Sequence, residues 1–188
     1  MIDRNKIEAG VRLILEGMGE QLDREGLLET PARVARMYEE LFAGMEADAG
    51  EHLKKVFHAD NREMVVERDI SFYSTCEHHM LPFFGRVHIV YLPSGKVAGL
   101  SKLARTVEVF ARRLQIQEQM TAQIADALMA HLAPEGVLVL AEAEHLCMTM
   151  RGVKKPGSTT VTMASRGVFA EDAARREEAM RLLELGRR

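Results

Sequence analysis

The chain has 188 residues, of which 47% are hydrophobic and 28% charged. This composition is ordinary for a soluble globular protein, and the length suits one main domain with a sizeable core. The formal net charge of −3 argues against general nucleic-acid binding. No apolar run is long enough to span a bilayer, and the N-terminus lacks the apolar core of a signal peptide, so we expect a cytoplasmic protein.

The first part of the chain is expected to be helical. Apolar residues at helical spacing over residues 7–18 predict a first helix. Thr30 and Pro31 have the pattern of an N-cap followed by proline, and they predict a second helix that runs to Gly44. Arg33 falls in the first turn of this helix, where free backbone N–H groups favour an anion. A solvated surface arginine is the alternative interpretation.

Two strands are predicted in the middle of the chain. Residues 64–73 and 83–92 alternate between apolar and other side chains and are rich in valine and isoleucine. Residues 93–95, Pro-Ser-Gly, are expected to close the second strand as a hairpin turn.

A helix that begins near Ser101 carries two basic residues. Ser101 is a natural N-cap, and Lys102 and Arg105 lie three residues apart on one side of the helix. Free N–H groups and two positive charges together suit phosphate oxygens, so this side is a candidate phosphate-binding site. The alternative is a solvated basic face. A second helix is predicted over residues 118–132.

The last part of the chain predicts two more strands and a terminal helix. Residues 137–150 alternate as a strand does, and the period of two places His145 and Cys147 on the same face. A strand over residues 159–163 and a charged amphipathic helix over residues 171–185 follow.

The order of these elements predicts the fold class. After residue 62 the order is strand, strand, helix, helix, strand, strand, which is typical of an α+β domain with a mainly antiparallel sheet. We therefore divide the chain into an N-terminal helical region over residues 1–62 and a main domain over residues 63–188.

A candidate metal site combines Cys76, His78 and His79 with His145 and Cys147 far downstream. Cys76 and His79 have the C-x-x-H spacing with which a tight turn presents a sulfur and a nitrogen to one ion, and Cys147 would add a second sulfur. Two thiolates and one imidazole suit Zn²⁺, and three protein ligands leave one tetrahedral position open. His78 and His145 each lie beside a ligand, where they could transfer protons.

Spacing alone leaves other interpretations of these residues open. The two cysteines could form a disulfide or be inert buried thiols, and His78 or His145 could complete a structural site as a fourth ligand. Fe²⁺ could occupy a similar catalytic site. A reducing compartment fits the cysteine usage, because no cysteine is left over for a disulfide framework.

Several short motifs follow one another along residues 29–169. They are Cys76-Glu77-His78-His79, Gly99-Leu100-Ser101-Lys102, Ala111-Arg112-Arg113-Leu114-Gln115, Gln117-Glu118, His145-Leu146-Cys147 and Arg151-Gly152-Val153. In this order they closely resemble the GTP cyclohydrolase I family, whose members open the guanine ring of GTP and release formate. Their product is 7,8-dihydroneopterin triphosphate, and the reaction is the first step of folate and pterin biosynthesis.

The resemblance implies one zinc ion per subunit, held by Cys76, His79 and Cys147, with an activated water that attacks C8 of guanine. It implies that His78 and His145 transfer protons. It also implies that the Glu118 carboxylate accepts hydrogen bonds from the N1–H and amine edge of guanine. The remaining substrate positions that it implies are Gln117 for the base, Ser101, Lys102, Arg105 and Arg151 for the triphosphate, and Arg33 from a neighbouring subunit.

The fold that the resemblance implies is the tunnelling fold, an antiparallel sheet with two helices on one face, here preceded by N-terminal helices. Subunits of this fold join their sheets into a barrel, and two rings stack into a homodecamer with active sites between subunits. Such pairing would cover the edge strands of an open sheet. The rival functions are another enzyme of this fold, which reduces a nitrile or tautomerises a pterin, and a non-catalytic zinc-stabilised nucleotide-binding module.

Overall fold

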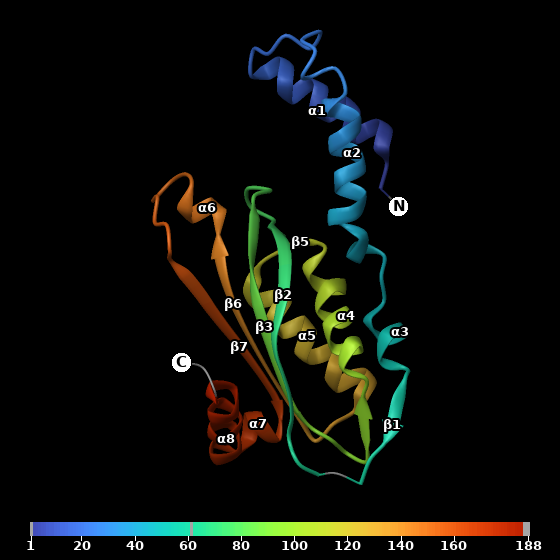
Figure 1. The fold of residues 1–188 in the computed structure, drawn as a ribbon, viewed down its shortest axis with the longest axis vertical. Helices are drawn as coiled ribbons and strands as arrows, with labels where there is room; N and C mark the ends of the chain where they lie inside the picture. The colour runs from blue at the N-terminus through green and yellow to red at the C-terminus, as the bar shows by residue number, and fades with distance from the viewer. Residues whose placement is uncertain (1, 61, 186–188) are drawn as a thin grey trace.

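The computed structural model describes residues 2–60 and 62–185. A sheet of long strands has helices on both faces, and a pair of helices extends beyond one end of it (Figure 1). The elements are α1 (Arg4–Gly17), α2 (Thr30–Leu41), η1 (Ala43–Met45), α3 (Ala49–Leu53), β1 (Val56–His58), β2 (Val65–Cys76), β3 (Pro82–Leu92), β4 (Lys96–Ala98), α4 (Leu100–Ala111), β5 (Leu114–Gln115), α5 (Gln117–Leu132), β6 (Gly136–His145), α6 (Leu146–Thr149), β7 (Thr159–Gly167), α7 (Val168–Glu171) and α8 (Ala173–Glu184).

The main sheet has the strand order β5-β2-β3-β6-β7, and its neighbours are antiparallel except for β5, which runs parallel to β2. The predicted hairpin at residues 93–95 is wrong. β3 is already paired on both edges by β2 and β6, so the chain leaves the sheet at Leu92. β4 pairs instead with β1 in a separate two-stranded sheet.

The two faces of the sheet are covered by different helices, because successive residues of a strand point to opposite sides. α4 and α5 lie on one face, and α7 and α8 lie on the other at the far end from the helical pair (Figure 1). The first face buries Ile89, Tyr91, Val137 and Val139 against Leu103, Ile124 and Leu128. The second buries Val90, Leu92, Leu138 and Leu140 with Phe169, Ala179 and Leu183.

The predicted ends of several helices are also corrected. Gly99, not Ser101, is the N-cap of α4, so Ser101 lies inside the first turn. Glu29 is the N-cap of α2 in place of Thr30. The terminal helix is interrupted at Asp172, which has an extended backbone and caps α8 by accepting from two backbone N–H groups.

The observed architecture confirms the predicted α+β class. It is a mainly antiparallel sheet with two helices on one face, preceded by N-terminal helices. Within residues 2–60 and 62–185, every helix is too short or too polar to cross a membrane.

Candidate metal centre and substrate site

The turn after β2 positions the first two predicted metal ligands. The Cys76 N–H donates to Leu81 O at 2.9 Å, and the Met80 N–H donates back to Cys76 O at 2.9 Å. The Glu77 N–H donates to Gln115 O at 3.0 Å, which ties the turn to β5. Cys76 is buried at the end of β2, and His79 is exposed on the turn that follows.

Cys147 reaches the same place by a route that differs from the prediction. The strand predicted over residues 137–150 ends at His145, and Cys147 lies in the short helix α6. The helix breaks the period-two register, so His145 and Cys147 do not share a strand face. The turn of α6 nevertheless brings Cys147 to the end of β2.

Together Cys76, His79 and Cys147 form what we call the Cys-His-Cys group. One ligand atom from each, two sulfurs and a ring nitrogen, lie within 4.8 Å of one another. Two thiolates bound to one tetrahedral zinc at ~2.3 Å would be ~3.8 Å apart, so the spacing of the three ligand atoms is compatible with one zinc ion. Both cysteines are free thiols, which excludes a disulfide in this structure. The donor set fits a metal ion, and the residues present could hold one.

The surroundings of the Cys147 thiol shift its pKa in opposite directions. Burial raises the pKa of the Cys147 thiol, and the neighbouring Cys76 raises it further, whereas Arg151 lowers it. Because thiols bind metal as thiolates, a cation would offset the opposition to ionisation. Arg151 Nη1 lies 3.1 Å from His79 Nε2, so this predicted triphosphate residue stands beside the group.

His78 and His145, the predicted proton-transfer residues, both border the Cys-His-Cys group. His78 is exposed, and its Nδ1 lies 3.8 Å from Cys76 Sγ. The His145 ring stacks on Phe83 with the ring centroids 4.6 Å apart and the planes at 2°. Burial lowers the pKa of His145, and the charge of Glu118 opposes this shift.

The contact with Phe83 was not predicted from the sequence. It depends on the pairing of β3 with β6, which sets Phe83 directly opposite His145. No local pattern in either strand signals that register, because the two residues are far apart along the chain.

The start of α5 adds the predicted base-binding residues. Glu118 is exposed in the first turn of the helix, whereas Gln117 is buried with its Oε1 2.7 Å from His145 Nε2. Both residues line a cavity of about 230 Å³ at the metal group. The cavity is lined by Cys76, His78, His79, Gln115, Ile116, Gln117, Glu118, His145, Cys147, Met148 and Thr160.

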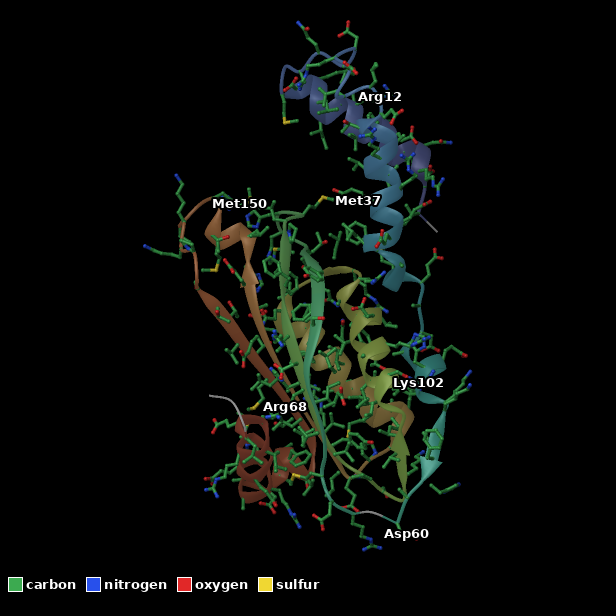
Figure 2. The ribbon with its side chains drawn as sticks, viewed as in Figure 1. Arg12, Met37, Asp60, Arg68, Lys102 and Met150 are labelled. Carbon is green, nitrogen blue, oxygen red and sulfur yellow. The ribbon has the colours of Figure 1, made fainter. Side chains whose placement is uncertain are left out.

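The other predicted triphosphate residues lie away from the Cys-His-Cys group in the folded structure. β5, which follows α4, pairs with the end of β2, so the C-terminal end of α4 is the end near the metal group. Lys102 lies nine residues before Ala111 at that end, or ~14 Å along the helix axis. Figure 2 shows Lys102 far from Met150, which directly follows α6.

Ser101 and Arg105 belong to the same half of α4 as Lys102. Arg33 lies on α2, in the helical pair that extends away from the sheet, where it is exposed and forms an ion pair with Glu29 at 2.8 Å. A single chain therefore brings together the metal group, both histidines, Glu118 and Arg151. It does not bring the other predicted triphosphate residues to them.

The Cys-His-Cys group, which could hold a metal ion, lies beside a cavity on an α+β fold, and this arrangement is typical of the class of metal-dependent enzymes. The GTP cyclohydrolase I family profile matches residues 7–184, and the chain belongs to this family. The relative named GTP cyclohydrolase 1 in Carboxydothermus hydrogenoformans is 61% identical over 184 residues, which cover 97% of this chain and 96% of that protein. The one in Pelotomaculum thermopropionicum is 60% identical and covers 97% and 98% respectively.

A relative with a lower identity matches over a similar length. GTP cyclohydrolase 1 of Clostridium perfringens is 54% identical over 185 residues, which cover 98% of this chain and 100% of that protein. Among solved structures, archaeosine synthase QueF-Like in the apo form is similar with a TM-score of 0.47 and 17% identity. That match covers 57% of this chain and 97% of the other.

Proposed function

We propose that this protein hydrolyses the guanine ring of GTP at C8, releases formate and forms 7,8-dihydroneopterin triphosphate, the first step of folate and pterin biosynthesis. The observation that carries the proposal is the Cys-His-Cys group opening onto the cavity that His145 and Glu118 line, in a chain of the GTP cyclohydrolase I family. A cytoplasmic location accords with a nucleotide substrate.

The metal that we assign to Cys76, His79 and Cys147 is one Zn²⁺ per subunit. Two sulfurs and one imidazole nitrogen are ligands of the kind that zinc prefers, and three of them leave one position open. When bound, zinc would supply a Lewis acid that makes hydroxide available near neutral pH. His78 and His145 would then take up and return protons at the reacting ring, because an imidazole nitrogen can either accept or donate a proton.

Recognition of the base is assigned to Glu118. A carboxylate can accept two hydrogen bonds from the N1–H and the exocyclic amine of guanine, and adenine lacks that pair of donors. Glu118 is exposed at the cavity, so its oxygens are accessible to a base. The carboxylate therefore provides a physical reason for GTP to be preferred over ATP.

We further propose that complete active sites form between subunits of a homodecamer. The cavity of about 230 Å³ is small for a nucleoside triphosphate, since ligand sites commonly measure ~300–1,000 Å³. Lys102, Arg105 and Ser101 lie toward the other end of α4, and Arg33 lies on a different part of the chain. The edge strand β7 also exposes Val161 and Met163 (57% and 51%), which pairing with another subunit would cover.

The experiment that tests the activity is incubation of the zinc-loaded protein with GTP, followed by measurement of formate and of the pterin chromophore. We expect both products, and we expect chelation of zinc to abolish both. ATP under the same conditions serves as the control for recognition by Glu118. Intact GTP after incubation with a zinc-loaded, assembled protein would favour the rival function of a nucleotide-binding module.

A further inference from the structure

The side chain of Gln117 joins His145 to the strands β6 and β7. It is 1% exposed, and its Oε1 lies 2.7 Å from His145 Nε2. Its amide nitrogen lies 3.1 Å from Ala141 O, 3.0 Å from Thr160 O and 3.1 Å from Thr162 Oγ1. Both ends of the amide are therefore bonded within the protein.

These neighbours determine which way the amide of Gln117 points. The carbonyl oxygens of Ala141 and Thr160 only accept hydrogen bonds, so they must face the amide nitrogen. The reverse orientation would place Oε1 against two carbonyl oxygens with no hydrogen between them. Oε1 therefore faces His145, and since Oε1 carries no hydrogen, His145 Nε2 must be the donor. Nδ1 is then the ring nitrogen that can accept a hydrogen bond.

Two threonine hydroxyls complete the arrangement. Thr162 Oγ1 accepts from the Gln117 amide and lies 2.7 Å from Thr121 Oγ1, to which its own hydroxyl can donate. The Thr121 hydroxyl donates in turn to the backbone oxygen of Gln117 at 2.8 Å. Each donor of this closed set finds an acceptor, so the buried amide is held in a single orientation.

Phe83 and Gln117 constrain different motions of His145. The stacked ring of Phe83 sets the plane of the imidazole, and the hydrogen bond from Nε2 sets the rotation of the ring within that plane. Residues that hydrogen-bond a reactive histidine commonly orient its ring and determine which nitrogen carries the hydrogen.

We propose that Gln117 is a positioning residue that acts on the substrate through His145, with Thr162 and Thr121 as its supports, rather than by contacting the base itself. The resemblance to the family implies a direct contact, but the buried amide is already bonded to His145, to two carbonyl oxygens and to a hydroxyl. This inference rests on the proposed function, because it assigns the way in which His145 is held for that reaction.

The test is the variant Gln117→Met in the full-length, zinc-loaded enzyme. Methionine has a similar length and shape but makes none of the hydrogen bonds of the amide. We expect kcat to fall by ~10–100-fold, which is the usual effect of removing a residue that hydrogen-bonds and orients a functional histidine. The KM for GTP should be unchanged. Lost kcat without a change in KM indicates an interaction that acts on the transition state rather than on binding.

The matched control is Gln123→Met, on the same helix α5. Gln123 Oε1 accepts from Gln115 Nε2 at 2.9 Å, so this variant also removes a glutamine hydrogen bond, but not one to His145. We expect its kcat to be close to that of the wild type. Zinc content and thermal unfolding of both variants separate a positioning effect from loss of metal or fold.

A second pair of variants decides the matter if Gln117→Met does not fold. Thr162→Val removes one acceptor of the amide and should lower kcat by a smaller factor, whereas Thr162→Ser keeps the hydroxyl and should retain activity. A raised KM in Gln117→Met would overturn the proposal in favour of direct base contact. Unchanged kinetics in Gln117→Met, or equal kcat in the two Thr162 variants, would also overturn it. A wild type that releases no formate would instead refute the proposed function.

Discussion

Replacing Gly85 with alanine tests how closely β3 and β6 must approach each other beside the site. A Cβ atom on Gly85 would lie 1.9 Å from Glu142 O and 2.8 Å from the Cα of Ala143. Ordinary contact begins at 3.4 Å, so the atoms nearest the new methyl group must move by 3.4 − 1.9, or about 1.5 Å. Both neighbouring atoms belong to the backbone, and neither can yield by a change of rotamer.

The expected loss of stability follows from this geometry. Overpacking a well-packed site destabilises by ~1–3 kcal/mol, and a clash with the backbone of a central strand belongs at the upper end. About 3 kcal/mol corresponds to a Tm lower by ~6–12 °C for a chain of this size. Because Phe83 precedes Gly85 by two residues on β3 and lies opposite His145, a wider spacing should also lower kcat.

Thermal unfolding followed by circular dichroism, at one fixed protein concentration, measures this effect. Gly10→Ala is the control, because the space around Gly10 in α1 is open. In a helix interior that change should stabilise by ~0.5–1 kcal/mol. A Tm for Gly85→Ala equal to that of the wild type would show that the sheet accommodates the methyl group, and the reasoning would then be wrong.

Three further predictions concern the site. Cys147→Ser should leave little zinc by metal analysis, because a thiolate ligand is lost; full zinc would exclude Cys147 as a ligand. Glu118→Gln should raise the KM for GTP by ~10–100-fold, since a hydrogen bond to a charged group contributes ~1.5–3 kcal/mol; an unchanged KM would contradict the guanine role. Lys102→Met and Cys147→Ser should each be inactive alone. When the two variants are mixed and reassembled, formate release should return, because one subunit can supply Lys102 and its neighbour Cys147. No recovery would argue against active sites that form between subunits.

Local sequence patterns predicted most of the helices and strands, and they indicated residues that lie together in the Cys-His-Cys group. Alternation over residues 83–92 identified β3, and the C-x-x-H spacing identified a turn that does present Cys76 and His79 together. Both signals are local, because the period of a strand and the reach of a tight turn depend on a few neighbouring residues. The predicted hairpin at residues 93–95 failed because a turn signal does not say whether the edge of the preceding strand is free.

The sequence by itself indicated Cys76, His79 and Cys147 as candidate metal ligands, and its motifs indicated the family. Only the tertiary structure decided that Cys147 joins the Cys-His-Cys group from α6, that Phe83 and Gln117 contact His145, and that Lys102 lies toward the other end of α4. These arrangements depend on strand register, helix direction and the packing of distant segments. Residue types at neighbouring positions do not specify them, because each arises between parts of the chain that meet only after folding.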